Sequence, residues 1–251
     1  MIGAVPLTLV LAFLVTALLY ASVGFGGGST YAALLALSGL DYRLLPLVAL
    51  ACNIVVVAGG TIRFARAGLV PWRAAFGLTA LAAPAAFLGG LTPIDEASFL
   101  ALLGASLVLT GAAMLCPVAE DTDAKPTRFA TAMPFIAAPL GYLAGLVGIG
   151  GGIFLAPLLH LTRWRPPREV AATASLFILV NSLFGIGGQL AKPGALPLGA
   201  AIPPALPLLI AVAIGGQVGS LMAVRLLPVR WVRWLTAALV VFVGARLLLS
   251  L

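Results

Sequence analysis

The polar side chains inside the long apolar stretches of this sequence are neutral hydroxyls and amides. No Asp, Glu, Lys or Arg falls near the middle of any apolar segment. Such groups can hydrogen-bond a ligand, but they form no carboxylate relay of the kind that often marks proton-driven pumps. The candidates are Ser29, Thr30, Asn53, Thr61, Thr173, Ser175, Asn181, Gln189 and Gln217.

Two glycine clusters interrupt apolar runs, and each is followed by a short apolar segment. One spans Gly24–Thr30 (GFGGGST) and the other Gly148–Phe154 (GIGGGIF). A helix broken in mid-membrane leaves free N–H groups on the next half-helix, and these groups, with the positive end of the helix dipole, can bind an anion. Close packing of helices through small residues is the alternative. We expect an anion site that contains Gly26, Gly27, Gly28, Ser29, Thr30, Gly150, Gly151, Gly152 and Ile153.

The two asparagines occupy corresponding positions in the two halves of the chain. Asn53 matches Asn181 at a shift of 128 residues, while the glycine clusters match at a shift of 124. An internal duplication explains both matches. An amide can donate to an anion without a counter-charge, or it can form an interhelical hydrogen bond, and both roles stay open. The expected substrate-binding set is completed by Asn53, Asn181, Thr173, Ser175 and Gln189.

The composition is that of an integral membrane protein. Of the 251 residues, 62% are hydrophobic and 8% are charged, whereas soluble domains carry roughly 25% charged residues. The net charge of +7 comes from Arg and Lys at loop edges, which is their usual place in membrane proteins. The expected partner is therefore the lipid bilayer and not nucleic acid, and a homo-oligomer stays open.

Ten apolar segments are expected, and together they predict an all-α polytopic membrane protein with two repeats. Each repeat is a glycine-broken helical hairpin followed by three transmembrane helices. The first repeat is expected at 1–116, a polar linker at 117–128 and the second repeat at 129–251. The segments are 6–22, 29–38, 44–60, 72–90, 97–116, 129–147, 153–161, 170–188, 198–226 and 229–251.

The arginines favour inverted repeats over parallel ones. If each broken pair is a hairpin that returns to the side it entered, all three arginine clusters share one side of the membrane, and Asp95 and Glu96 lie opposite. If each pair crosses once, the later two clusters change sides. The positive-inside rule favours the first arrangement, with basic loops in the cytoplasm. The clusters are Arg63, Arg66 and Arg73, then Arg163, Arg165 and Arg168, then Arg225, Arg230 and Arg233.

No catalytic site, metal site or cofactor is expected. The two cysteines, Cys52 and Cys116, are far apart in sequence and lack metal-ligand spacing. His160 is the only histidine, and it precedes Arg163 near the end of a short segment. It is expected at the membrane interface, and a proton carrier or pH sensor is the alternative. An intramembrane enzyme would need a nucleophile, a base or a metal cluster, which these residues do not supply. A structural subunit would leave the matched glycine breaks without a use.

The stretches GFGGGSTYAALLALSG and GYLAGLVGIGGGIFLAPLLHL, each heading one half, resemble the TauE/SafE family of bacterial membrane proteins. The resemblance covers essentially the whole chain, and its second motif includes Phe154, Pro157 and Leu158. Ser29-Thr30 departs from the apolar continuation seen at Ile153-Phe154, so the two ends of the site need not be equivalent. The resemblance implies transport of sulfite, organosulfonates or related anions across the bacterial cytoplasmic membrane. An alternating-access carrier, driven by substrate protonation or by the membrane potential, is the leading interpretation, and an anion-selective channel is the alternative.

Overall fold

The computed structural model describes residues 5–22, 26–115, 132–194, 198–222 and 229–250, and these residues form ten helices without strands. The expected linker, 117–128, lies outside them, as do Gly24 and Phe25 of the first glycine cluster and Cys116. The repeat boundaries therefore stay a prediction. The helices are α1 (Leu7–Ser22), α2 (Gly28–Leu37), α3 (Leu45–Arg66), α4 (Trp72–Leu91), α5 (Glu96–Leu115), α6 (Met133–Val147), α7 (Gly152–Leu161), α8 (Pro167–Ala191), α9 (Leu198–Met222) and α10 (Val229–Leu249).

Five described helices are long and apolar enough to cross a membrane. They are α3, α4, α5, α8 and the 201–220 part of α9, each with at least 20 residues, or about 30 Å at 1.5 Å per residue. By contrast, α2 and α7 have 10 residues each, enough for about half of the hydrocarbon core. Large apolar side chains such as Phe76 and Phe135 point outward on α4 and α6. The protein is an all-α polytopic membrane protein, as the sequence predicts.

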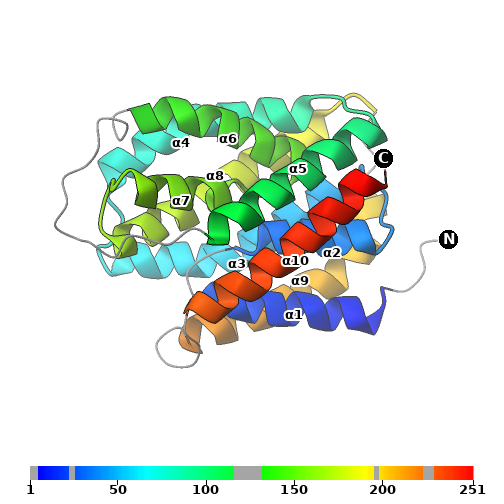
Figure 1. The fold of residues 1–251 in the computed structure, drawn as a ribbon, viewed down its shortest axis with the longest axis horizontal. Coiled ribbons are helices and arrows are strands. Elements are labelled where there is room, and N and C mark those ends of the chain that lie inside the picture. Colours follow the sequence, from blue (N-terminus) through cyan, green and yellow to red (C-terminus); the bar gives the residue numbers. More distant parts are fainter. Residues whose placement is uncertain (1–4, 23–25, 116–131, 195–197, 223–228, 251) are drawn as a thin grey trace.

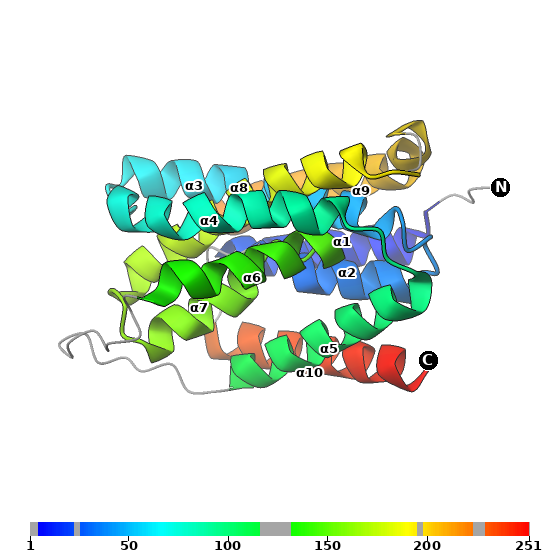
Figure 2. The ribbon, with the colours of Figure 1, turned by 90° about the horizontal axis from the view of Figure 1, so that it is seen from above.

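The helices form three layers (Figure 2). The first layer contains α4, α8, α3 and α9, which contact one another in that order. The broken pairs α1–α2 and α6–α7 form the middle layer, and α5 and α10 pack against each other beneath it. The half-helix α2 therefore lies between α3 and α10, and α7 lies between α8 and α5. Both half-helices are covered by protein on two sides.

Each glycine-broken pair returns to the end of the molecule at which it enters (Figure 1). The pair α1–α2 opens toward the end that carries the α2–α3 and α4–α5 connections. The pair α6–α7 opens toward the opposite end, which carries the α3–α4 and α7–α8 connections. We call these the α4–α5 end and the α3–α4 end. Opposed hairpins are what the inverted-repeat interpretation requires, although the symmetry itself stays a prediction.

The helix boundaries follow the expected segments closely, with differences at two arginine-rich turns. The third helix continues past Gly60 to Arg66, because Arg63 and Arg66 occupy its last turn, where cations interact favourably with the helix dipole. The eighth begins at Pro167, since proline suits the first turn of a helix. Asp95 caps α5 by accepting a 2.9 Å hydrogen bond from the backbone N–H of Ser98.

A long helix of each half also packs against the hairpin of the other half. The contact between α4 and α6 is tight because Gly141 and Gly145 face the backbone of Ala82 and Ala86. The corresponding contact between α9 and α1 places Gly215 on the backbone of α1. Small residues let helix backbones approach closely in membranes, where burial from water supplies little attraction between helices.

Replacing Gly145 with Ala should lower the stability of the α4–α6 contact. The added Cβ would meet the carbonyl of Ala86, and overpacking of this kind costs about 1–3 kcal/mol. Thermal unfolding of the purified protein in detergent should show a lower Tm. Gly77→Ala on α4 is the matched control, since no heavy atom outside its own helix lies within 4 Å of that Cβ. Equal Tm values for the two variants would contradict the close contact.

Candidate functional site

The two half-helices begin in the same unusual way. Their N-cap residues, Gly27 and Gly151, have left-handed φ angles of 80° and 77°, and neither helix has a side-chain cap. Gly27 O accepts from Tyr31 N at 2.9 Å, and Gly151 O accepts from Phe154 N at 3.1 Å. The preceding N–H groups have no hydrogen-bond partner among the described residues. They belong to Gly28, Ser29 and Thr30 in α2, and to Gly152 and Ile153 in α7.

The two glycine breaks meet at Asn53, which is completely buried on α3. Its Nδ2 donates a 3.3 Å hydrogen bond to the carbonyl of Ile149 in the second break. Gly28 touches the same carbonyl and the same amide from the first break. A Cβ on Gly150 would lie 2.8 Å from Asn53 Nδ2 and 3.3 Å from Ser182 Oγ on α8. Glycine is therefore required on both sides of this amide.

The helices α3 and α8 run antiparallel beside the breaks and align their polar residues. Toward the α3–α4 end, Thr61 Oγ1 and Ser175 Oγ form a 3.0 Å hydrogen bond. One turn closer to the α4–α5 end, Val57 on α3 and Ile178 on α8 both face Gly26. They lie 2.9 and 3.3 Å from the position that a Cβ on Gly26 would take. The next turn brings α3 and α8 to the meeting point of the breaks. This contact fixes where the two glycine segments sit relative to each other.

Several polar atoms of the helices beside the breaks are buried without a hydrogen-bond partner among the described residues, some at the meeting point and some further along α8. Buried polar groups in proteins are normally paired, and each unpaired one costs about 1–3 kcal/mol. Most of these atoms belong to α2, α3 and α8, the helices that enclose the breaks. They include Ser29 Oγ, Tyr31 Oη, Asn53 Oδ1, Thr173 Oγ1, Ser182 Oγ, and both Oδ1 and Nδ2 of Asn181. A cluster of unused donors and acceptors is what an unliganded polar site would leave.

Other expected site residues are already engaged within the protein. Thr30 Oγ1 bonds Tyr20 Oη at 2.9 Å, and Ser175 bonds Thr61. Gln189 Nε2 donates to the carbonyls of Gly145 and Leu146 in the last turn of α6, at 2.9 and 3.3 Å. These carbonyls are among those a helix C-terminus leaves unpaired. Asn53 and Gln189 thus form hydrogen bonds between elements, whereas Asn181 has no hydrogen-bond partner among the described residues.

The expected residues are not all in one place. The breaks, Asn53 and Ser182 are in mutual contact, and Asn181 is adjacent to Ser182 in sequence. Thr173 and Gln189 lie eight residues before and after Asn181 on α8, about 12 Å away along the helix axis. The assignment of all these residues as ligands stays a prediction.

Two polar residues of this region, Tyr31 and Ser182, were not among the expected site residues. Each follows a residue that was expected, at Thr30 and Asn181, and both are completely buried. Tyr31 stacks on Phe13 with ring centroids 4.8 Å apart, and its hydroxyl is unpaired among the described residues. A tyrosine directly after Ser29-Thr30 in a half-helix was the available signal, because a buried hydroxyl needs a partner.

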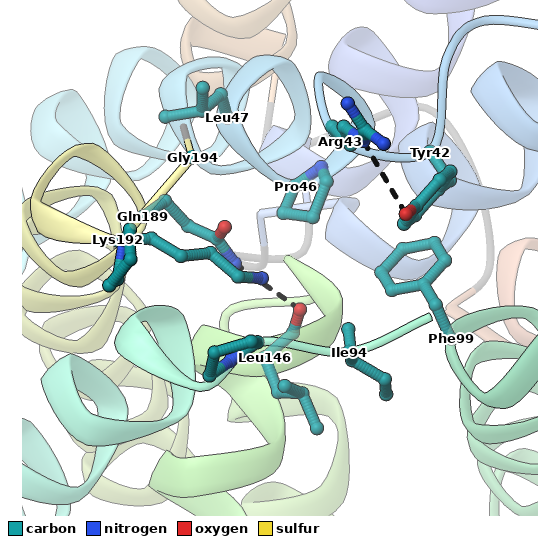
Figure 3. A pocket seen from close by; sticks show the side chains of 12 residues that line it. Tyr42, Arg43, Pro46, Leu47, Ile94, Phe99, Leu146, Gln189, Lys192 and Gly194 are labelled. Atoms are coloured by element: carbon teal, nitrogen blue, oxygen red, sulfur yellow. Dashed lines mark hydrogen bonds between the residues drawn. The ribbon is translucent and has the colours of Figure 1, made fainter. Parts of the chain in front are cut away.

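A pocket of about 320 Å³ opens at the α4–α5 end, separate from the buried meeting point of the breaks. Figure 3 shows Lys192 and Gln189 on one wall and Arg43 with Tyr42 on the opposite wall. Arg43 Nε donates to Tyr42 Oη at 3.4 Å. The remaining lining residues are mostly apolar or backbone: Pro46, Leu47, Pro93, Ile94, Phe99, Leu146, Pro193 and Gly194.

The pKa values of the two cations at this pocket shift in opposite directions. Partial burial lowers the pKa of Lys192 at the end of α8, because its charged form loses hydration. The hydrogen bond to Tyr42 raises the pKa of Arg43, with a further contribution from Asp41 and Glu96. The ion pair found among the described residues joins Arg165 and Glu169, 3.3 Å apart, at the other end of the molecule. The side chains of Lys192 and Arg43 therefore form no ion pair with a described carboxylate.

Comparison with known proteins identifies the family. The family model described as "Sulfite exporter TauE/SafE" matches residues 9–247, nearly the whole chain. The chain belongs to this family. It is also 36% identical over 245 residues to a protein of Sinorhizobium fredii described as "Probable membrane transporter protein y4hK", covering 96% of this chain and 97% of the relative. No solved structure matches the chain significantly.

Membership of the TauE/SafE family agrees with the structure. The family is one of membrane transporters, and the five long apolar helices are those of a multi-pass protein of the cell membrane.

Gly150→Ala should be more destabilising than an alanine at an equally left-handed glycine with free space around it. An alanine at either Gly150 (φ 81°) or Gly39 (φ 71°) should lower the free energy of unfolding by about 1–2 kcal/mol through backbone strain. Only at Gly150 does the Cβ also meet Asn53 and Ile178, whereas nothing lies within 4 Å at Gly39. Thermal unfolding should therefore show a larger loss for Gly150→Ala.

A double-mutant cycle separates the contact from the strain. Combined with Asn53→Ala, the Gly150→Ala substitution should cost less than it does in the parent, with a coupling energy of about 0.5 kcal/mol or more. Strict additivity of the two changes would show that the second glycine break does not contact the amide.

Proposed function

We propose that this protein is a secondary carrier that moves a small sulfur-containing anion across the cytoplasmic membrane. The anion binds where the two glycine breaks meet, and the two halves open the site alternately to each side. The single observation that carries the proposal is the arrangement at Asn53. Two uncapped half-helix N-termini converge there among buried polar atoms that lack partners.

The donors at this site suit an anion. Free N–H groups at a helix N-terminus point toward a ligand, and the helix dipole favours negative charge there. Hydroxyls of Ser29 and Ser182 and the amide of Asn181 add further unpaired donors. Because none of these groups carries a full charge, binding is weak enough to allow release, which a carrier cycle requires.

The acceptors at this site suit an anion that carries a proton. Asn53 Oδ1 and Asn181 Oδ1 are buried without donors among the described residues, and a carbonyl oxygen can accept only from an O–H or N–H group. A partly protonated oxyanion, such as hydrogen sulfite, supplies one. Substrate protonation would then couple transport to the proton gradient, and the membrane potential would act on the remaining charge.

The opposed directions of the two hairpins support alternating access. The two hairpins open toward opposite ends of the molecule, so each half can gate one side of a shared central site. The completely buried Asn53, Asn181 and Ser182 are closed to solvent, as expected of an occluded step in such a cycle.

The arginines support one orientation in the membrane. Six lie at the α3–α4 end, in the last turn of α3, the first turns of α4 and α8, and the α7–α8 connection. The positive-inside rule assigns that end to the cytoplasm. They are Arg63, Arg66, Arg73, Arg163, Arg165 and Arg168.

Asn181→Asp should abolish anion transport, because it places a carboxylate of nearly the same shape in the proposed site, where it repels the substrate. Purified protein in liposomes is given radiolabelled sulfite or sulfoacetate, and the parent should transport at least one of them. We expect the initial rate to fall more than tenfold. Ser250→Asp adds the same charge at an exposed position after α10, outside the proposed site, and should transport within twofold of the parent. Parental rates for Asn181→Asp, with a parental elution profile, would contradict the site.

Counterflow separates a carrier from a channel. Liposomes preloaded with unlabelled substrate should transiently accumulate labelled substrate above its external concentration, because a carrier exchanges one molecule for another. A channel only equilibrates the label. Transport without counterflow, at channel-like throughput, would overturn the alternating-access mechanism while leaving the anion site in place.

A further inference from the structure

The pocket at the α4–α5 end is placed to receive a ligand from water. It is bounded by the start of α3, the end of α8, the α4–α5 connection and Phe99 of α5 (Figure 3). Its volume of about 320 Å³ is at the lower end of the range for small-molecule sites. The positive-inside orientation argued above assigns this end to the side opposite the cytoplasm.

The pocket combines positive charge with apolar walls. Lys192 is partly buried and has no carboxylate in contact with it among the described residues, so its ammonium has lost some hydration without gaining an ionic partner. Arg43 adds a second cation on the opposite wall. An anion between them would restore the interactions that burial removes.

The apolar lining discriminates among anions. Pro93, Ile94 and Pro193 offer carbon surface beside the two cations. A bare oxyanion such as sulfite gains nothing from such surface, whereas an anion with a hydrocarbon group buries that group there. The chemistry of the pocket therefore fits an organic anion whose acidic group faces Lys192.

The pocket also adjoins the second glycine break. Leu146 and Gln189 line it, and Gln189 holds the last turn of α6 through the carbonyls of Gly145 and Leu146. Two residues after Leu146, Gly148 lies against Pro46, another lining residue. A ligand in the pocket is thus separated from the break by little more than the last turn of α6 and one proline.

We infer that this pocket is a second binding site, which takes an organic anion by its sulfonate or carboxylate group on Lys192 and Arg43 and by its hydrocarbon group on Ile94. This inference rests on the proposed function, since the pocket would be the entry site from which a ligand reaches the central site on the non-cytoplasmic side. It differs from that site in using full charges and apolar side chains in place of backbone N–H groups.

Isothermal titration of the full-length protein in nanodiscs tests this site directly. The probe is propane-1-sulfonate, and the comparison ligand is sulfite. Lys192→Gln should weaken propanesulfonate binding at least tenfold, and Lys192→Arg should restore most of it. Arg246→Gln removes one charge from the last turn of α10, where it is exposed and outside the pocket lining, and should change binding less than twofold. Ile94→Ala should weaken propanesulfonate binding but leave any sulfite binding unchanged.

The Asn181→Asp variant separates the failure of this inference from failure of the proposed function. Propanesulfonate should still bind to this variant, because the pocket does not include Asn181. Any of three results would overturn the second site. The first is parental affinity of Lys192→Gln for propanesulfonate, and the second is an equal loss of affinity in Lys192→Gln and Arg246→Gln. The third is that propanesulfonate fails to bind to the parent or to Asn181→Asp. Loss of transport in Asn181→Asp would still support the central one. Conversely, absent transport by the parent would defeat the proposed function, while the titrations would still report on the pocket.

Discussion

A backbone that leaves the helical conformation inside a membrane must be enclosed by protein, and the arrangement of this molecule follows from that requirement. Lipid offers no hydrogen bonds to free N–H and C=O groups. The half-helices α2 and α7 are accordingly covered by α3 and α8 on one side and by α10 and α5 on the other. The long helices α4 and α9 then seal the outer limbs of the two hairpins. Three layers are needed because two breaks have to be buried at once.

Asn53 connects the breaks to this enclosure. It joins a helix of the first half to a carbonyl in the second break, and glycines from both breaks press on its amide. Its counterpart Asn181 forms no such bond among the described residues. One asparagine therefore stabilises the junction, while the other is the one that the proposed function assigns to a ligand. A movement that exchanged these roles would be a two-state change of the kind that alternating access requires.

Much of the fold could be predicted because apolar runs, glycines and arginines act locally. The half-helix at Gly28–Leu37 ends where Ser38 and Gly39 follow, and Asp95 marks the start of α5. The site was harder to predict, since side-chain partners depend on distant elements. Nothing in the sequence around Gln189 indicates that its amide caps α6, or that Lys192 and Arg43 line one pocket. Those contacts join residues more than 40 positions apart, so no local pattern encodes them.

The two halves of the central site differ in chemistry despite their shared backbone. After its break the first half continues with Ser29, Thr30 and Tyr31, whereas the second continues with Ile153, Phe154 and Leu155. An anion held between the two N-termini would therefore meet hydroxyl donors on one side and only backbone N–H groups on the other. Since hydroxyls can supplement the N–H groups only in the first half, substrate preference should depend more on α2 than on α7. In the proposed carrier, the duplicated backbone would supply the anion site, and the divergent side chains would adjust what it accepts.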